Sequence, residues 1–534
     1  MIIIGAVAVI LVIVGAFALM GGSHDDDPTH LTVAAHSNIK EPKAGFSPLV
    51  GWGCGHQNYN PLVQSCLFKT DKNGTMVPDL ATNYTISNDG KTWTVHVRDD
   101  VKFSDNSTFD AEDVAFTFNT AKSTESELDL TNIENVTATD AKTVEFNLVE
   151  PRSTFIYDLR YVGIVPSDSY DNNTYGEKPI GTGPYVLDHW DKGQQAIFKA
   201  NDNYYGDKPY FTQITLLFPE EATWLELAKS GDVDVVPVAT SALNQTVDGY
   251  QFVEKSAGRA QGISFPYLKD NGESWNGTYK IGNNVTSDKA IRQALNVGVN
   301  RQKMCDDIFH GHATPEYTGV DTRAYVNPAA KVNDSNVDEA KQILKDGGWE
   351  DTNGDGIVEK DGVKASFDLY YPPDYLDRQS LATVFAEQAK EIGIEVNLVG
   401  ADWDTIYANM YSSAAVMQQT SPDPYKSIYQ QYHSKEADGF YMIPGLYNNT
   451  DSDKLMDDAM HSSDLNAANT LWSQSAFVNG GGWGPAGDAP FAWLVNYDYN
   501  YFIKNGIDIG EQPDGLGNDI LINICEWTRT NSTS

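Results

Sequence analysis

Residues 78–118 read PDLATNYTISNDGKTWTVHVRDDVKFSDNSTFDAEDVAFTF and hold the clearest structural signals in this chain. Asn-Asp-Gly at 88–90 indicates a tight turn, because glycine supplies the positive φ that such turns need. Residues 91–101 alternate apolar and polar side chains, which is the pattern of a half-buried strand. Acidic residues at 110–113 favour a helix N-terminus, where the helix dipole stabilises negative charge. The segment therefore predicts a hairpin, a strand, a turn and a helix.

The fixed residues of this segment resemble family 5 of the extracytoplasmic solute-binding proteins, which serve ABC importers of peptides and nickel. Members commonly read P-x-LA at the start, DG-x-[TW] at the turn and A-x-D-V in the helix, and residues 78–118 match nearly every such position. More family motifs have counterparts in family order: IGTGPYVL at 180–187, NDNYYGDKP at 201–209, GDVDV at 231–235 and KAIRQALNVGVNR at 289–301. The resemblance extends from about residue 31 to beyond residue 500.

The resemblance implies an α/β fold of the two-lobed periplasmic-binding-protein type, in its large three-subdomain form, with a ligand cleft between the lobes. The chain's own pattern agrees, because a strand at 367–370, a helix at 380–392 and a strand at 394–398 predict a βαβ unit. Residues 289–301 predict another helix, with Val299 on its apolar stripe. The expected domains are lobe I at 31–70, 206–285 and 491–534, an inserted subdomain at 71–205, and lobe II at 286–490.

Length and charge narrow the classes of function. A chain of 534 residues is too long for one ordinary core, and 41% hydrophobic residues indicate a globular protein. The net charge of −37 argues against nucleic-acid binding, which needs basic surfaces. An acidic surface could attract cationic solutes, or could simply keep the protein soluble.

The first 24 residues predict export. Residues 2–20 form an almost pure apolar run of about the length of a membrane span, and Ala-Phe-Ala at 16–18 fits a cleavage site. We expect an uncleaved membrane anchor rather than a cleaved signal peptide, with everything after residue 24 outside the cytoplasm. Glycosylation sequons fit a glycoprotein at the outer face of the cell membrane, at Asn73, Asn83, Asn106, Asn135, Asn244, Asn276, Asn284 and Asn448 among others.

Four cysteines allow one short disulfide. Cys54 and Cys66 could close a small loop in an oxidising compartment, worth about 3 kcal/mol. Buried thiols are an equally good interpretation of the same residues. No C-x-x-C pair is present, so the sequence does not support a zinc knuckle or a thioredoxin-type motif.

Two stretches carry the first candidate ligand contacts. Ser-Pro-Asp-Pro at 421–424 places Asp423 in a rigid turn, where its carboxylate could satisfy local N–H groups. In peptide-binding members of the family, the matching Asp pairs with the peptide's α-amine, and a carboxylate suits an ammonium group. Tyr429, Tyr432 and His433 follow, and in nickel-binding members a His in this stretch helps to hold the metal or its chelate. The usual Trp-Gly before the motif is absent here.

Two more candidates lie in the first half of the chain. The glycine-rich loop GWGCGHQNYN at 51–60 faces the cleft in the family, so Trp52, His56 and Tyr59 could contact a ligand or pack the lobe. Arg160 could clamp a carboxylate, as an Arg in roughly this region does in nickel-chelate binders, or could form a surface salt bridge.

The segment DTNGDGIVEKDG at 351–362 begins like a calcium loop. Asp351, Asn353 and Asp355 occupy loop positions 1, 3 and 5, and Ile357 would offer its carbonyl oxygen at position 7. Gly stands at position 12 instead of Glu, so Glu359 or Asp361 would have to supply the missing ligand. The alternative is an Asp- and Gly-rich hairpin.

The chain is thus interpreted as a non-enzymatic solute receptor. It would capture a peptide, or nickel or a nickel chelate, by lobe closure, act as a monomer, and deliver its ligand to the permease and ATPase subunits of an ABC importer. No cofactor is expected apart from the calcium ion. The alternative function is a membrane-anchored sensor or adhesion protein on the same fold. A hydrolase is disfavoured, because H-E-x-x-H, G-x-S-x-G and P-loop lysine motifs are absent from the sequence.

Overall fold

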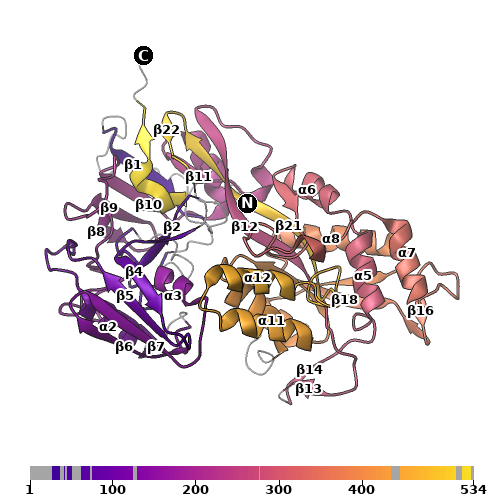
Figure 1. The fold of residues 1–534 in the computed structure, drawn as a ribbon. Helices are drawn as coiled ribbons and strands as arrows, with labels where there is room; N and C mark the ends of the chain where they lie inside the picture. The colour runs from indigo at the N-terminus through magenta and orange to yellow at the C-terminus, as the bar shows by residue number, and fades with distance from the viewer. Residues whose placement is uncertain are drawn as a thin grey trace. The chain divides into compact units, whose positions relative to one another are not determined.

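The structure is a computed structural model, and its elements are drawn in Figure 1. It describes residues 27–36, 41–42, 45–50, 62–72, 75–123, 129–275, 277–434, 446–512 and 520–530. The predicted N-terminal anchor lies outside these residues. Within them, no helix has the length and apolar character that a membrane crossing requires.

The chain divides into two compact units, residues 1–257 with 499–534, and residues 258–498. Two long strands, β12 (Tyr250–Ser264) and β21 (Phe491–Lys504), pass from one unit into the other. The sequence prediction placed the crossings near residues 285 and 491. Because each crossing lies inside a continuous strand, the strand pattern in the sequence runs through it without a break.

The first unit has a mixed sheet around its N-terminal strand. β1 (His30–Ala34) pairs in parallel with β10 (Gln213–Leu217) and with β11 (Val235–Pro237). β10 continues antiparallel into β9 (Gln195–Ala200) and β8 (Tyr185–Asp191). The core under this sheet is apolar and includes Leu31, Val33, Phe198, Ile214, Tyr501 and Trp527. The C-terminal residues therefore complete a core that the N-terminal strand begins.

Residues 81–148 form a second, four-stranded antiparallel sheet in the first unit. Its order is β4 (Ala81–Ile86), β5 (Thr92–Val97), β7 (Thr143–Leu148) and β6 (Ile133–Asp140), and α2 (Ala111–Ser123) packs on β6 and β7. Gly90 turns the β4–β5 hairpin with a φ of +71°. Alternate residues of β5, including Trp93, are buried. The predicted hairpin, strand and helix of residues 78–118 are confirmed.

The second unit contains the predicted βαβ unit. β18 (Ser366–Tyr371), α8 (Leu376–Glu391) and β19 (Glu395–Gly400) follow one another, and the two strands are parallel. β20 (Ala414–Gln419) is also parallel to β18 and pairs antiparallel with β12. Further elements are α5 (Lys289–Gly298), α6 (Arg301–Phe309), β15 (Ala313–Pro315), α7 (Val337–Asp346), α9 (Trp403–Asn409), α11 (Thr450–Met460) and α12 (Leu465–Ser475).

The motif at 289–301 is two helices rather than one. α5 ends at Gly298, and Val299 is extended with a φ of −69° and a ψ of 148°. The side chain of Asn300 then caps α6 by accepting from the N–H of Lys303 at 2.8 Å. The prediction of a single helix through Val299 is wrong. The apolar side chain of Val299 fits the helical spacing of the sequence, but its backbone is not helical.

The buried guanidinium of Arg301 connects the junction of α5 and α6 to neighbouring segments of the second unit. Nε of Arg301 donates to the backbone oxygens of Glu316 and Trp493, at 2.9 and 2.7 Å. Nη1 and Nη2 donate to the backbone and side-chain oxygens of Asn296, and Asp334 lies 3.3 Å from Nη1. The cation therefore satisfies acceptors from three segments that are far apart in the sequence.

Replacing Arg301 by Leu should lower the free energy of unfolding by about 3–5 kcal/mol, because it removes the donor from several backbone carbonyl groups and the ion pair from Asp334. Urea unfolding monitored by tryptophan fluorescence measures the loss. Lys303→Gln is the matched control on the same helix, since its ion pair with Asp307 is fully exposed to solvent and adds little to stability. Similar losses in both variants would show that the buried network has no special importance.

Glu316 is a buried acid beside this network. Its carboxyl oxygens accept from the N–H of Asp321 at 3.0 Å and from Nδ2 of Asn496 at 3.2 Å. Burial, and then the nearby carboxylate of Asp321, raise the pKa of Glu316 to about 8. The protonated form is therefore the one that the fold favours.

The stability that protonated Glu316 provides should be complete below pH 4.5 and lost as the pH rises to about 8, because the folded pKa lies above the unfolded value. Urea unfolding at several pH values should show the wild type losing on the order of 2–4 kcal/mol across this range. Glu316→Gln should lack that part of the loss, whereas Glu391→Gln, an exposed control, should retain it. A parallel decline in Glu316→Gln and wild type would contradict the assignment.

Candidate functional site

The segment that holds Asp423 leaves the end of β20 and enters a short helical stretch, Tyr425–Tyr429 followed by α10 (Gln430–Tyr432). Asp423 is fully buried. Its Oδ1 accepts from the N–H of Tyr425 at 2.9 Å, and its backbone oxygen accepts from Oγ of Ser427 at 2.8 Å. The carboxylate is thus held in one orientation at the start of this stretch, between Pro422 and Pro424.

Tyr429 and His433 lie against α11. Their rings stack at 4.2 Å between centres. Oη of Tyr429 donates to Oδ1 of Asp457 at 3.0 Å, and Nε2 of His433 lies 3.2 Å from the same oxygen. Tyr432 instead points into the core of the second unit, where its hydroxyl accepts from Nε1 of Trp493 at 3.1 Å. This segment therefore carries four of the eight predicted ligand contacts, and all four contact other groups of the protein.

Arg160 lies in the first unit, on α3 (Phe155–Tyr161). Its side chain is only 1% exposed, and Nη1 donates to Oγ1 of Thr70 at 2.8 Å. The alternative of a surface salt bridge is wrong for this residue, because the guanidinium is enclosed. Its role towards a ligand carboxylate stays a prediction.

The loop with Trp52, His56 and Tyr59 lies outside the described residues, and so does Cys54. Cys66 is buried, and burial raises the pKa of its thiol. The disulfide and the contacts of this loop stay predictions.

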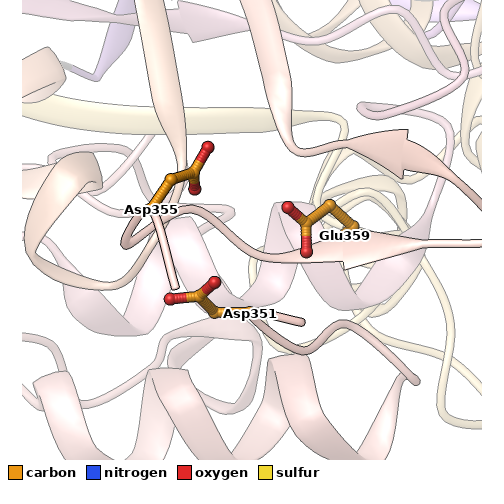
Figure 2. Close-up of side chains that lie close together, drawn as sticks. All are labelled: Asp351, Asp355 and Glu359. Atoms are coloured by element: carbon orange, nitrogen blue, oxygen red, sulfur yellow. The ribbon is translucent and has the colours of Figure 1, made fainter. Parts of the chain in front are cut away.

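The acidic loop at 351–362 gathers three carboxylates, and Figure 2 shows them turned towards a common space. Oxygens of Asp351, Asp355 and Glu359 lie within 4.8 Å of one another. Asn353 donates through Nδ2 to Glu359, and the N–H of Ile357 donates to Asp355 at 2.9 Å.

The hairpin alternative also describes this region. β16 (Glu359–Lys360) and β17 (Val363–Lys364) are antiparallel, and Asp361 lies in the turn between them with a φ of +53°. The structure therefore brings Glu359, rather than Asp361, to the other carboxylates.

The sequence prediction missed a polar cluster at the first turn of α8. Asp377 accepts from Oη of Tyr497 at 2.6 Å and from Nε2 of Gln261 at 3.2 Å. The neighbouring Arg378 donates to Oε1 of Gln418 at 2.9 Å. These side chains come from α8, β12, β20 and β21, so no single sequence motif predicts the cluster. A charged pair directly after a strand and Pro-Pro was the one available signal.

Residues 75–439 match the family model described as bacterial extracellular solute-binding proteins, family 5. Protein XP55 of Streptomyces lividans is 31% identical over 91% of this chain and 88% of its own length. The oligopeptide-binding protein AppA of Bacillus subtilis is 27% identical over 80% of each chain. The nickel-binding periplasmic protein of Escherichia coli is 29% identical over 66% of this chain and 67% of its own.

The fold is shared with solved structures. The crystal structure of NikZ from Campylobacter jejuni, in complex with Ni(L-His), aligns with a TM-score of 0.74 at 22% identity. The alignment covers 94% of this chain and 100% of that one. The predicted two-lobed α/β fold is thereby confirmed.

Proposed function

Because this chain belongs to family 5 of the bacterial extracellular solute-binding proteins, we propose that it delivers a peptide to the permease of an ABC importer. Members of this family bind solutes outside the cytoplasm. We therefore propose that this chain binds its solute without catalysing a reaction. AppA of Bacillus subtilis, which is similar over 80% of this chain, is named an oligopeptide-binding protein. A nickel chelate is the second candidate, favoured by the nickel-binding relative and by the fold shared with the Ni(L-His) complex.

Asp423 is the observation that supports a peptide. Its carboxylate is fully buried, and a backbone N–H fixes one of its oxygens. A buried carboxylate in a set orientation suits an ammonium group, since a charge-assisted hydrogen bond is shorter and stronger than a neutral one. The α-amine of a peptide is such a group, and a nickel ion would instead seek imidazole nitrogen.

The proposal extends to the cell surface. Of the eight sequon asparagines named above, six are described, and all six are exposed: Asn83, Asn106, Asn135, Asn244, Asn284 and Asn448. Exposure is what glycan attachment requires, so we propose that the protein is glycosylated and that residues 1–24 anchor it. Permease and ATPase genes beside its own gene would favour the importer over a sensor or an adhesion protein.

Native mass spectrometry of the protein purified from its own host should detect bound peptides. The same spectra report the glycan mass and whether residues 1–24 are retained. Asp423→Asn should then weaken binding of those peptides about 100-fold in calorimetry, because the ammonium would lose its buried partner. Asp458→Asn, which removes an exposed carboxylate from α11, should leave the affinity unchanged.

Two outcomes would contradict the peptide proposal. One is stoichiometric nickel with no peptide in the native spectra, which would favour His433 and His56 as nickel-binding residues. The other is unchanged peptide affinity in Asp423→Asn, which would remove Asp423 from the site.

We further propose that the acidic loop holds a structural calcium ion through Asp351, Asp355 and Glu359, with the carbonyl oxygen of Ile357. Three carboxylates within 4.8 Å repel one another, and a hard divalent cation would offset that repulsion. Calcium at about 1 mM should raise the unfolding midpoint of the full chain by about 3 °C, because extracellular calcium sites often bind in this range.

Matched variants of the loop test this site. Asp355→Asn and Glu359→Gln should abolish the calcium response, while Asp361→Asn should keep it. An unchanged midpoint in the wild type, or an equal response in all variants, would rule out the ion.

A further inference from the structure

The four-stranded sheet of residues 81–148 has two edge strands, β4 and β6. An edge strand presents backbone N–H and C=O groups that no neighbouring strand binds, so it can pair with a strand of another molecule. Each edge strand here also carries a glycosylation sequon, at 83–85 in β4 and at 135–137 in β6. The two edges can therefore be compared directly, because they differ in how their backbone groups are covered.

The edge of β6 is covered by side chains of α2. Nδ2 of Asn119 donates to the backbone oxygen of Val136 at 2.8 Å, and Oδ1 of Asn119 accepts from the N–H of Val136 at 3.2 Å. The side-chain amide thus takes the place of a neighbouring strand at this residue. Nζ of Lys122 donates to the backbone oxygen of Glu134 at 2.8 Å. Helix α2 therefore satisfies much of this edge from within the chain.

The edge of β4 has no such cover among the described residues. The N–H of Ser87 donates to the backbone oxygen of Thr92, next to β4 in the same hairpin. Residues that face a neighbouring strand alternate along an antiparallel ladder, so the backbone groups of Tyr84 and Ile86 face away from β5. The hydrogen bonds of the described residues include no partner for these groups. Two residues of β4 thus leave their backbone donors and acceptors open to a further strand.

The sequence of β4 gives this edge little protection of its own. Ala81–Ile86 reads ATNYTI, which holds no charged residue and no proline. Charges and prolines are common means by which natural proteins keep an edge strand from pairing. Short segments of high β-propensity and low net charge are the ones that stack with copies of themselves. β6, by contrast, holds Glu134 and Asp140.

Asn83 lies directly before the first open residue, on the exposed face of the strand. Asn83 and Thr85 are exposed, whereas Tyr84 is half-buried and stacks on Trp93 with 5.1 Å between ring centres. A strand added to this edge would lie about 4.8 Å from β4, and its side chains would neighbour those of Asn83 and Thr85. A sugar ring attached to Nδ2 of Asn83 would overlap the space that those side chains need.

We propose that an N-linked glycan on Asn83 shields the open edge of β4 and keeps the protein from associating with copies of itself. This rests on the proposed function, which makes the protein a glycoprotein. The glycan would come from an oligosaccharide bound to a lipid phosphate. The bond from Nδ2 to the anomeric carbon forms, the bond from that carbon to the phosphate oxygen breaks, and the amide proton ends on the released phosphate. A glycan on Asn135 would have no such role, since α2 already covers its edge.

Glycopeptide mass spectrometry of the protein from its own host should find Asn83 occupied. Asn83→Gln and Asn135→Gln, purified from that host, each remove one glycan from one edge strand. Sedimentation velocity at about 50 µM protein compares their association, since open strand edges associate at micromolar to millimolar concentration. Asn83→Gln should self-associate at least about tenfold more tightly than the wild type, whereas Asn135→Gln should match the wild type.

Thr85→Lys separates the edge from a general effect of glycans on solubility. It removes the sequon but places a lysine on the open edge, where a charge opposes strand pairing. This variant should stay as monomeric as the wild type although its Asn83 is bare. Thr85→Ala, which also removes the sequon, should associate like Asn83→Gln, so the result does not depend on the folding of one variant. Equal association of Asn83→Gln and Asn135→Gln, or association of Thr85→Lys as tight as that of Thr85→Ala, overturns the proposal.

The glycopeptide spectra also distinguish this proposal from the proposed function. Glycans at other sequons with a bare Asn83 would reject the shield and retain the glycoprotein. No glycan at any sequon would reject both. Peptide affinity is a separate measurement, because β4 is not proposed to contact the solute, so Asn83→Gln should bind peptide as the wild type does.

Discussion

The second unit depends on the buried guanidinium of Arg301. It lies where α5 ends, where the chain leaves β15, and where β21 passes towards the first unit. Each of these segments presents a backbone carbonyl that would be buried without a donor, and one planar group satisfies them all. Arg292 does the same one helix earlier, through the carbonyl groups of Thr286 and Asp488. A delocalised cation with five fixed donors is suited to this, because a lysine could not reach several acceptors in one plane.

This explains why the most recognisable motifs of the chain are not those proposed to contact its solute. The signature at 289–301 supplies Arg292, Asn296 and Arg301, which connect helices to strands. The signature at 78–118 supplies a turn glycine, the buried face of β5 and the first turn of α2. Such residues hold a fold that many ligands can use. Asp423, the group proposed to bind the solute, follows β20 and lies outside both signatures.

Several elements were predictable because their signals are local. The alternation in β5, the turn at Gly90, the acidic start of α2 and the βαβ unit of β18, α8 and β19 all follow from short-range pattern. Other elements were not. Val299 continues a helical pattern but is extended, since the cap by Asn300 starts a new helix there. The sequence gives no signal where β12 and β21 pass from one unit into the other, because each is one continuous strand on both sides of the boundary.

The sequence by itself determined the family, the α/β class and the residue types that a charged solute would need. Only the tertiary structure decided which of those residues have partners. It places Tyr429 and His433 against Asp457, buries Arg160, and brings Glu359 rather than Asp361 to the other carboxylates of the acidic loop. The physical reason is that hydrogen bonds and burial are satisfied between segments tens or hundreds of residues apart. A motif records which groups are present, and the packing of distant strands and helices decides which of them remain available to a ligand.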